Sequence, residues 1–425
     1  MQLLEPLKLF LVLSLLGVSM AQESTFRLLK IESSSSRIPL EAILSGGPPP
    51  QGIPALGFSG DWQAVTKATQ GISFVSQAEA SAWLDDKEPL IIVSLQGESK
   101  AYPLQILTWH EIVNDTLAGV PIAVTFCPLC NSALAFDRRI PLDNAMQTQL
   151  ANFRPDLASR WQQADQGFKE SYQAQLFKEL DPKLATLEVT FGVSGLLYNS
   201  NLLMFDSETS SLWSQLSGEG AVGNLSQAQL LRYPAQIISF AELKSSYPQA
   251  LVLSRDTGFN RDYGRNPYLG YDDAASPPFL YAGHLDERLP PKERVISLSL
   301  AGEDVAYPFS LLSEHRVLVD EVGQANIVLF WQEGTASALD GRSIATSRDV
   351  GAVGVFSAQL DEQNLSFYWD GENFRDRETE STWNISGLAI AGELAGKNLK
   401  AIIHDNTLWF AWVAFKPQTR IYSHP

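Results

Sequence analysis

The chain has 425 residues and a formal net charge of −17, and 45% of its residues are hydrophobic. The excess of acidic residues argues against nucleic acid and against an anionic membrane surface as partners, because both repel a negatively charged protein. The chain contains only two cysteines, Cys127 and Cys130, so a disulfide scaffold is excluded and the fold must rest on a hydrophobic core.

The first 21 residues have the features of a secretory signal peptide. The apolar run Leu9–Met20 is too short to span a bilayer, and Ser19-Met20-Ala21 fits the small-x-small pattern of a cleavage site. No later segment of the sequence approaches a membrane span. The sequence therefore predicts a periplasmic or secreted protein without a membrane span in the mature chain.

Residues 22–60 contain clusters of serine, glycine and proline and predict a flexible lead-in. The β-branched run and the glycine turn within residues 90–102 predict a β-hairpin. Pro103 suits the first position of a helix, so a short amphipathic helix is expected over residues 104–115, ended by Ala118-Gly119.

Both cysteines lie in one predicted turn. A strand over residues 120–126 leads into Cys127-Pro-Leu-Cys130, and residues 133–137 are expected to return from it as the next strand. The following residues, 139–187, are rich in Gln, Lys, Asp and Ala, with helical spacing of the apolar positions. They predict a helical insertion between two strands.

Two pairs of landmarks recur later in the chain, and within each pair the spacing is kept. The recurring pairs are Ala101 and Ala306, His110 and His315, Asp206 and Asp376, and Trp213 and Trp383. Such repetition predicts a mainly β (α+β) fold with short helices, built as two tandem, diverged β-rich repeats packed as one body. The first repeat is expected over residues 61–254, with the Cys turn and the helical insertion, and the second over residues 294–425, without cysteines. With a one-residue gap, Phe126-Cys127 aligns with Phe330-Trp331.

Between the repeats, residues 255–293 form a connector rich in Tyr, Arg and Asp. A loop of this composition serves either as a binding rim or as a connector packed across both repeats, and the second interpretation is slightly favoured. The residues singled out as a candidate binding loop are Arg261, Asp262, Tyr263, Tyr268 and Tyr271.

Several unrelated motifs follow one another in an order that resembles a known bacterial family. They are Ala101-Tyr-Pro with Trp109-His-Glu-Ile-Val-Asn-Asp115, Thr125-Phe-Cys-Pro-Leu-Cys-Asn-Ser-Ala133, Gly192-Val-Ser-Gly-Leu-Leu-Tyr-Asn-Ser200, Leu212-Trp-Ser-Gln215, and Thr257-Gly with Arg261-Asp-Tyr-Gly264. From about Leu90 to the C-terminus the chain is similar to the family called domain of unknown function 3179. The resemblance implies a secreted or periplasmic bacterial protein and implies no reaction. The insertion departs from the compact hairpin expected in that family.

The Cys turn permits three kinds of chemistry. Two thiolates on a tight turn suit a transition metal such as copper or zinc, with His110 as the natural third ligand. A Cys-x-x-Cys pair also suits thiol/disulfide exchange, although the sequence that follows lacks the long helix of a thioredoxin. In an oxidising compartment the pair also forms a plain structural disulfide.

Three residues near the cysteines are candidates for supporting roles. Glu111 is expected to orient the imidazole of His110 or to act as a base, and Asp115 is a further possible ligand. Arg138 is expected to hold the charge of the thiolates or an anion. Because His315 persists in the repeat that lacks cysteines, a packing or hydrogen-bonding role is favoured for His110 over ligation.

The sequence thus predicts an exported protein whose Cys-x-x-Cys site binds a transition metal or undergoes thiol/disulfide exchange with a small molecule or a protein. The alternative is a non-enzymatic binding or interaction module that uses the connector, with Cys127 and Cys130 joined as a structural disulfide. Neither interpretation assigns an enzymatic activity.

Overall fold

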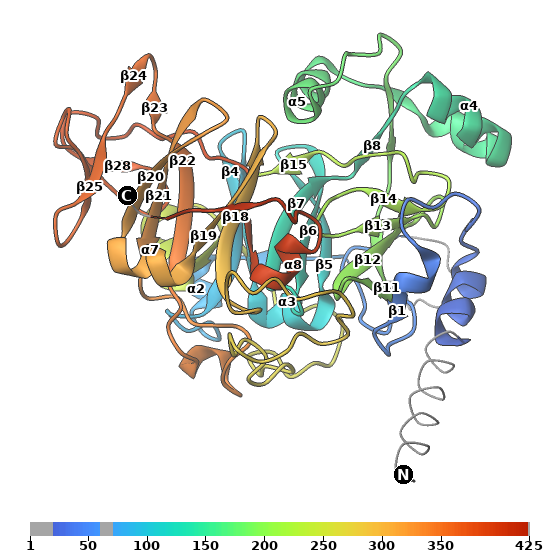
Figure 1. Ribbon diagram of the computed structural model, residues 1–425, viewed down its shortest axis with the longest axis horizontal. Helices are drawn as coiled ribbons and strands as arrows, with labels where there is room; N and C mark the ends of the chain where they lie inside the picture. The colour runs from blue at the N-terminus through green and yellow to red at the C-terminus, as the bar shows by residue number, and fades with distance from the viewer. Residues whose placement is uncertain (1–19, 60–70, 424–425) are drawn as a thin grey trace.

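The computed structural model describes residues 20–59 and 71–423. The fold is mainly β, with 36% strand and 19% helix, in several small sheets with short helices. This confirms the predicted fold class. In Figure 1 the sheet β25–β28 lies at the left, β5–β7 near the centre and β11–β14 at the right. The signal peptide predicted for residues 1–21 lies, except for its last two residues, outside the described chain.

The strands that precede the connector form sheets in the orders β1-β11-β12-β13-β14, β16-β3-β4-β17-β2, β15-β7-β6-β5 and β8-β10-β9. Their bounds are β1 (Ile43–Ser45), β2 (Phe74–Val75), β3 (Pro89–Leu95), β4 (Glu98–Pro103), β5 (Ile112–Leu117), β6 (Val120–Cys127), β7 (Ser132–Asp137), β8 (Arg139–Leu142), β9 (Gln162–Gln163), β10 (Ala185–Glu188), β11 (Phe191–Tyr198), β12 (Asn201–Asp206), β13 (Leu212–Ser214), β14 (Gly220–Val222), β15 (Arg232–Tyr233), β16 (Ala235–Ser239) and β17 (Leu251–Leu253). The helices of this half are η1 (Leu40–Ala42), α2 (Gln77–Ala80), α3 (Leu104–His110), α4 (Asn144–Phe153), η2 (Pro155–Arg160), α5 (Gln166–Leu176) and α6 (Phe240–Ser246).

The strands that follow the connector form sheets in the orders β29-β18-β19-β30, β20-β21-β22, β23-β24 and β25-β26-β27-β28. Their bounds are β18 (Arg294–Leu300), β19 (Glu303–Pro308), β20 (Val317–Val322), β21 (Ala325–Gln332), β22 (Ala352–Ser357), β23 (Gln359–Leu360), β24 (Gln363–Asn364), β25 (Phe367–Trp369), β26 (Phe374–Asp376), β27 (Thr382–Trp383), β28 (Ala389–Ala391), β29 (Asp405–Leu408) and β30 (Arg420–Ile421). The helices of this half are α7 (Phe309–His315), η3 (Ile344–Thr346) and α8 (Trp409–Val413).

Both halves contain the same succession of elements. A hairpin that ends in proline is followed by a short helix that ends at a histidine and then by a second hairpin. The first hairpin of each half gains an antiparallel strand on one side, β16 or β29, and a parallel strand on the other, β17 or β30. These correspondences agree with the repeated spacing in the sequence. Descent of the two halves from one repeated unit stays a prediction.

The two halves are joined by reciprocal contacts. β7 of the first half packs against β29 of the second, and β22 of the second half packs against β16 of the first. The same kind of reciprocity characterises two-fold interfaces between subunits. Because β7 leads directly out of the Cys turn, this junction brings residues from the far end of the chain to the cysteines.

The helix predicted over residues 104–115 is shorter than expected. α3 ends at His110, and Glu111 has a left-handed backbone with φ of 57°. The β-branched Ile112 and Val113 then pair with β6, where both side chains are buried. Ala118-Gly119 forms the turn between β5 and β6 and does not end a helix. Tertiary pairing with β6 therefore overrides the helical pattern.

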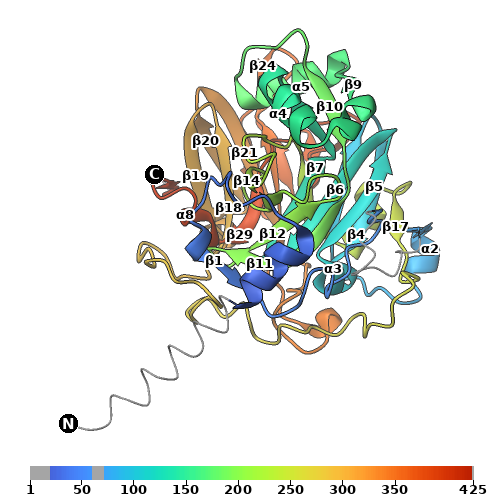
Figure 2. The ribbon, with the colours of Figure 1, turned by 90° about the vertical axis from the view of Figure 1, so that its right-hand side faces the viewer.

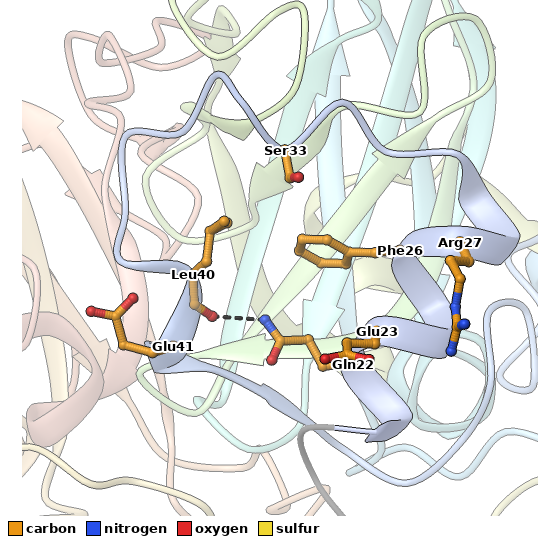
Figure 3. A pocket seen from close by; sticks show the side chains of 7 residues that line it. All are labelled: Gln22, Glu23, Phe26, Arg27, Ser33, Leu40 and Glu41. Atoms are coloured by element: carbon orange, nitrogen blue, oxygen red, sulfur yellow. Dashed lines mark hydrogen bonds between the residues drawn. The ribbon is translucent and has the colours of Figure 1, made fainter.

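The segment predicted as a flexible lead-in, residues 22–60, is anchored over its described part. Residues 20–29 form a helix, and β1 pairs with β11, as Figure 2 shows beside the blue N-terminal segment. The helix faces η1 across a cavity of about 440 Å³, where Gln22 Nε2 donates to Leu40 O at 2.7 Å (Figure 3). Apolar residues such as Leu29 and Ile43 alternate with the turn residues and are fully buried, which explains the anchoring.

The insertion over residues 139–187 contains α4 and α5, which project from the body at the upper right of Figure 1. It opens and closes with strands, because β8 pairs antiparallel with β10. No helix in the described residues is long and apolar enough to cross a membrane.

Candidate functional site

The Cys turn joins β6 to β7 as the sequence predicted. Cys130 N donates to Cys127 O at 3.1 Å and Asn131 N donates to Pro128 O at 3.3 Å. Asn131 adopts φ of 51°, a left-handed conformation that asparagine tolerates better than most residues. The turn is therefore a local structure that its own sequence specifies.

The second half of the chain holds this turn in place. Leu408 N and Thr407 Oγ1 both donate to Cys130 O at 2.9 Å. Asn131 Nδ2 donates to Asn406 Oδ1 at 3.0 Å. These residues of β29 lie far from the cysteines in the sequence, so only the packed protein has a complete Cys turn.

Both thiols are buried and free, with 2% of Cys127 and none of Cys130 exposed. Burial opposes ionisation of Cys127, but hydrogen bonds from the Cys130 thiol and from the backbone amides of Leu202, Cys130 and Leu129 outweigh it. The pKa of Cys127 is therefore lowered. Burial and the neighbouring Cys127 raise the pKa of Cys130 well above its usual value. Cys127 is thus the thiol that ionises first.

A buried carboxyl group lies beside these thiols. Glu111 follows α3, and its carbonyl oxygen accepts from Phe126 N at 2.8 Å, which fixes it next to the end of β6. Burial, reinforced by the charge of Cys127, raises the pKa of Glu111 well above its usual value. Tyr268 OH lies 3.5 Å from Glu111 Oε1. The sequence had assigned Glu111 to His110, whereas its electrostatic partner is Cys127.

The connector covers the Cys turn with two of the tyrosines expected to form a binding loop. Tyr268 contacts Glu111, and Tyr271 OH donates to Leu129 O at 3.0 Å. On its other side the connector bonds to the second half, with Gly270 N donating to Asp340 O at 2.8 Å. The connector therefore contacts both halves and closes the Cys turn from outside.

The other predicted connector residues lie around His110 or at the surface. Tyr263 OH lies 2.6 Å from His110 Nε2, and Arg261 is close enough to lower the pKa of that imidazole. Asp262 pairs with Arg265 at 3.4 Å on an exposed rim. The predicted binding loop is thus divided between two buried sites and the surface.

His110 has both ring nitrogens engaged away from the thiols. Nδ1 lies 2.8 Å from Pro54 O, and Nε2 lies 2.6 Å from Tyr263 OH. Burial lowers the pKa of His110 to about 4, and the hydrogen bond to Pro54 opposes this only in part. In the described part of the chain, no three His, Cys, Asp or Glu side chains have the arrangement of a metal site. The placement fits the hydrogen-bonding role and gives no support to ligation.

Acidification should destabilise the protein through this imidazole. The unfolded His110 binds a proton near pH 6.5 and the folded one only near pH 4, so its stabilising contribution is present above pH 6.5 and is lost as the pH falls through this window. The expected loss between about pH 7 and about pH 4 is about 3 kcal/mol. Urea unfolding at both pH values tests this, with His110→Gln expected to show a smaller loss. An equal loss in wild type and variant would contradict it.

Asp115 and Arg138 lie away from the thiols, which corrects their predicted supporting roles. Asp115 accepts from Tyr102 OH at 2.8 Å and pairs with Lys100 at 2.9 Å. Arg138 donates to Ile122 O at 3.0 Å. Asp115 is paired with Ile122 across the sheet, about 16 Å along β6 from Cys127. The expected helix would have brought Asp115 near the site, whereas β5 carries it away.

A buried polar network behind the thiols was not predicted. Asn201 Nδ2 lies 3.5 Å from Cys130 Sγ and donates to Gln215 Oε1 at 2.9 Å. Ser132 Oγ donates to the same oxygen at 2.7 Å, and Gln215 Nε2 donates to Thr125 Oγ1 at 3.0 Å. Thr125, Ser132 and Gln215 belong to the motifs that carry the family resemblance, and Asn201 directly follows one of those motifs, which was the signal that pointed to this network.

A comparison with known protein families matches residues 51–419 to the family described as protein of unknown function (DUF3179). The chain belongs to this family. The DUF3179 match confirms the resemblance, and it spans the Cys turn, the connector and β29. Comparisons with curated proteins and with solved structures found no match.

Proposed function

We propose that this DUF3179 protein is exported and that Cys127 and Cys130 carry out thiol/disulfide exchange. The observation that carries the proposal is that a buried carboxyl group, Glu111, lies beside the buried turn that holds two free thiols. The opposite pKa shifts give the two cysteines different roles. The lowered pKa of Cys127 makes it the attacking nucleophile, and the raised pKa of Cys130 keeps it protonated until the second attack.

The proposed substrate is a disulfide R–S–S–R′ of a protein or a small molecule. At rest the proton of the Cys127 and Glu111 pair sits on the Glu111 carboxyl group, whose pKa is raised, and the Cys127 thiolate attacks one sulfur, which breaks the S–S bond and releases R′S⁻ with the electron pair. Glu111 gives this proton to R′S⁻. The Cys130 thiol then loses its proton through Glu111 and attacks Cys127 Sγ, releasing RS⁻, which is protonated in turn. The cysteines are oxidised to a disulfide and the substrate is reduced to RSH and R′SH.

Access to the thiols depends on the connector. Since Cys127 is almost fully buried beneath Tyr268 and Tyr271, a substrate disulfide reaches its sulfur only when this segment moves aside. Small disulfides are therefore expected to react faster than disulfides in folded proteins. The hydrogen bond from Tyr271 OH to Leu129 O is the contact that must break.

The test is a redox titration of the full chain in buffers of reduced and oxidised glutathione, with the remaining thiols alkylated and counted by mass spectrometry. The expected result is one two-electron transition at a reduction potential above about −300 mV, with Glu111→Gln slowing its approach to equilibrium. The Cys127→Ser/Cys130→Ser double variant is the control without a transition. A potential below about −300 mV would identify a structural disulfide and favour the interaction module instead.

Copper or zinc at the same thiols is the second candidate. The observation in its favour is the pair of free thiols, Cys127 and Cys130, on one tight turn; within the described residues no third His, Cys, Asp or Glu side chain completes a metal site with them. The test is the metal content of protein purified without chelator. Near-stoichiometric copper or zinc that is absent from the double Cys→Ser variant would support a thiolate metal site. Metal binding would then replace thiol/disulfide exchange as the proposed function of the two cysteines.

A further inference from the structure

The second half of the chain has an open cleft where the first half has the Cys turn. It has a volume of about 740 Å³ and lies between the end of β21, the β25–β26 hairpin and α6. This volume is within the range of small-molecule sites. The lining residues used below are Glu242, Arg316, Trp331, Gln332, Trp369 and Asn373.

The correspondence between the two places rests on backbone geometry. Arg316 follows α7 with φ of 65°, as Glu111 follows α3 with φ of 57°. Trp331 N donates to Arg316 O at 2.8 Å, the same bond that Phe126 N makes to Glu111 O. Phe126 thus corresponds to Trp331 without a gap, and the one-residue gap of the sequence alignment is wrong.

The chemistry at the two places differs completely. Gln332 takes the register position of Cys127, and residues 333–351 replace the short Cys turn. The longer connection leaves the end of β21 beside a cleft, where the compact Cys turn leaves its thiols buried. The carboxyl, phenyl and thiol groups of Glu111, Phe126 and Cys127 are therefore replaced by a guanidinium, an indole and an amide.

The walls of the cleft are aromatic and their edges are polar. Trp331 and Trp369 line it, and the Arg316 guanidinium lies 4.4 Å above the Trp331 ring. Gln332 Nε2 lies 3.4 Å from Glu242 Oε2. Trp331 Nε1 is a buried donor for which the described atoms provide no hydrogen-bond partner. A buried donor of this kind favours a bound water as its partner.

The donor and acceptor set restricts the ligand class. Guanidinium and indole groups only donate, carboxylates only accept, and amides do both, so the ligand must present donors and acceptors close together. A phosphorylated ligand would meet the carboxylates of Glu242, Glu333 and Glu372, and a purely apolar ligand would desolvate the pairs that Arg316 makes with Glu333 and Gln332 makes with Glu242 without offering them further hydrogen bonds. A sugar ring meets both demands, because its hydroxyls donate and accept and its C–H face packs on an aromatic ring.

We propose that this cleft binds a neutral oligosaccharide, with Trp369 as the stacking surface and Gln332, Asn373 and Glu242 as hydrogen-bonding groups. The proposal is independent of the chemistry at the Cys turn. It gives the protein a recognition site in the second half and a reactive site in the first. The strand β25, which carries Trp369, lies at the left of Figure 1.

The test uses tryptophan fluorescence and calorimetry of the full chain with four probes, namely cellotetraose, maltotetraose, xylotetraose and chitotetraose. At least one is expected to bind saturably with a Kd between about 1 μM and about 1 mM. Trp369→Ala and Asn373→Ala should each weaken that binding, the first by at least about tenfold. Asn373→Ala keeps the test valid if the tryptophan variant does not fold, since the Asn373 side chain is partly exposed.

The Cys127→Ser/Cys130→Ser double variant is the matched control and should bind the sugar as the wild type does. The absence of saturable binding to all four probes would overturn the proposal. Binding that both cleft variants retain would place the sugar elsewhere and overturn it equally. Tetralysine is the competing probe, and binding of tetralysine without any oligosaccharide would show that the cleft selects cations.

Discussion

Cys130→Ser should accumulate a mixed disulfide on Cys127 when the protein is treated with oxidised glutathione, and Cys127→Ser should not. The reason is that the environment of Cys127 lowers its pKa whereas that of Cys130 raises its pKa. At neutral pH the attacking thiolate therefore forms on Cys127, and without Cys130 no second thiol resolves the adduct. Mass spectrometry of the intact protein detects the added glutathione. The adduct is expected to form at least about tenfold faster on Cys130→Ser than on Cys127→Ser.

Cys130→Ala provides a matched control for this experiment. The hydrogen bond from the Cys130 side chain is the largest of the interactions that lower the pKa of Cys127. Serine keeps a donor at this position and alanine removes it. The pH at which iodoacetamide alkylates Cys127 half-maximally should therefore be higher in Cys130→Ala than in Cys130→Ser. Equal adduct formation on both single serine variants, or on neither, would refute the assigned roles.

Asp272→Ala should lower the free energy of unfolding by about 3–5 kcal/mol, more than any other substitution proposed for this protein. Asp272 is buried in the connector, where it accepts from Arg294 at 2.6 Å and from Ser337 and pairs with Arg348 at 3.1 Å. Its removal leaves the buried guanidinium of Arg294 without its carboxylate. Because the free energy of unfolding of native proteins is only about 5–15 kcal/mol, this loss is a large fraction of the total. Urea unfolding followed by tryptophan fluorescence measures the loss.

Asp273→Ala is the neighbouring control, since Asp273 is exposed, and it should change the stability by no more than about 0.5 kcal/mol. The deficit of Asp272→Ala should also depend on pH. Burial opposes ionisation of Asp272, but Arg294, Ser337 and Arg348 outweigh it and lower the pKa of the folded carboxyl. Its stabilisation is present above the unfolded pKa of about 3.9 and is lost as the pH falls through the folded value. A deficit that stayed constant to below about pH 3 would contradict this account.

Asp272→Ala should also make the Cys127 thiol more accessible. Tyr271, which bonds to the Cys turn, immediately precedes Asp272, so loosening this anchor should let the connector move away from Cys127. Native Asp272→Ala is therefore expected to be alkylated faster at Cys127 than native wild type. This outcome would identify the connector as the barrier to substrate entry.

Local patterns in the sequence predicted the elements that short-range physics controls. The hairpin of β3 and β4 and the strand, turn and strand around the cysteines follow from β-branched runs and turn residues that are adjacent in the chain. The family membership was predicted for the same reason, because each of its motifs is a run of neighbouring residues. The sequence prediction placed the end of α3 too late. The apolar spacing of a helix continues past His110, but the pairing of Ile112 with Thr125 of β6 takes precedence over it.

The sequence by itself determined a mainly β protein with a Cys-x-x-Cys turn at the end of a strand, because alternation, turn residues and spacing are properties of neighbouring residues. Only the tertiary structure decided which side chains meet the thiols. Glu111 lies beside Cys127 because β5 pairs with β6, and Thr407 bonds to Cys130 across a separation of 277 residues because β29 packs against β7. His110 and Asp115 are nearer in sequence than Thr407, yet their hydrogen bonds go to Pro54 and Tyr102. Burial and strand pairing act between segments that the sequence does not bring together, and they therefore decide the composition of the site.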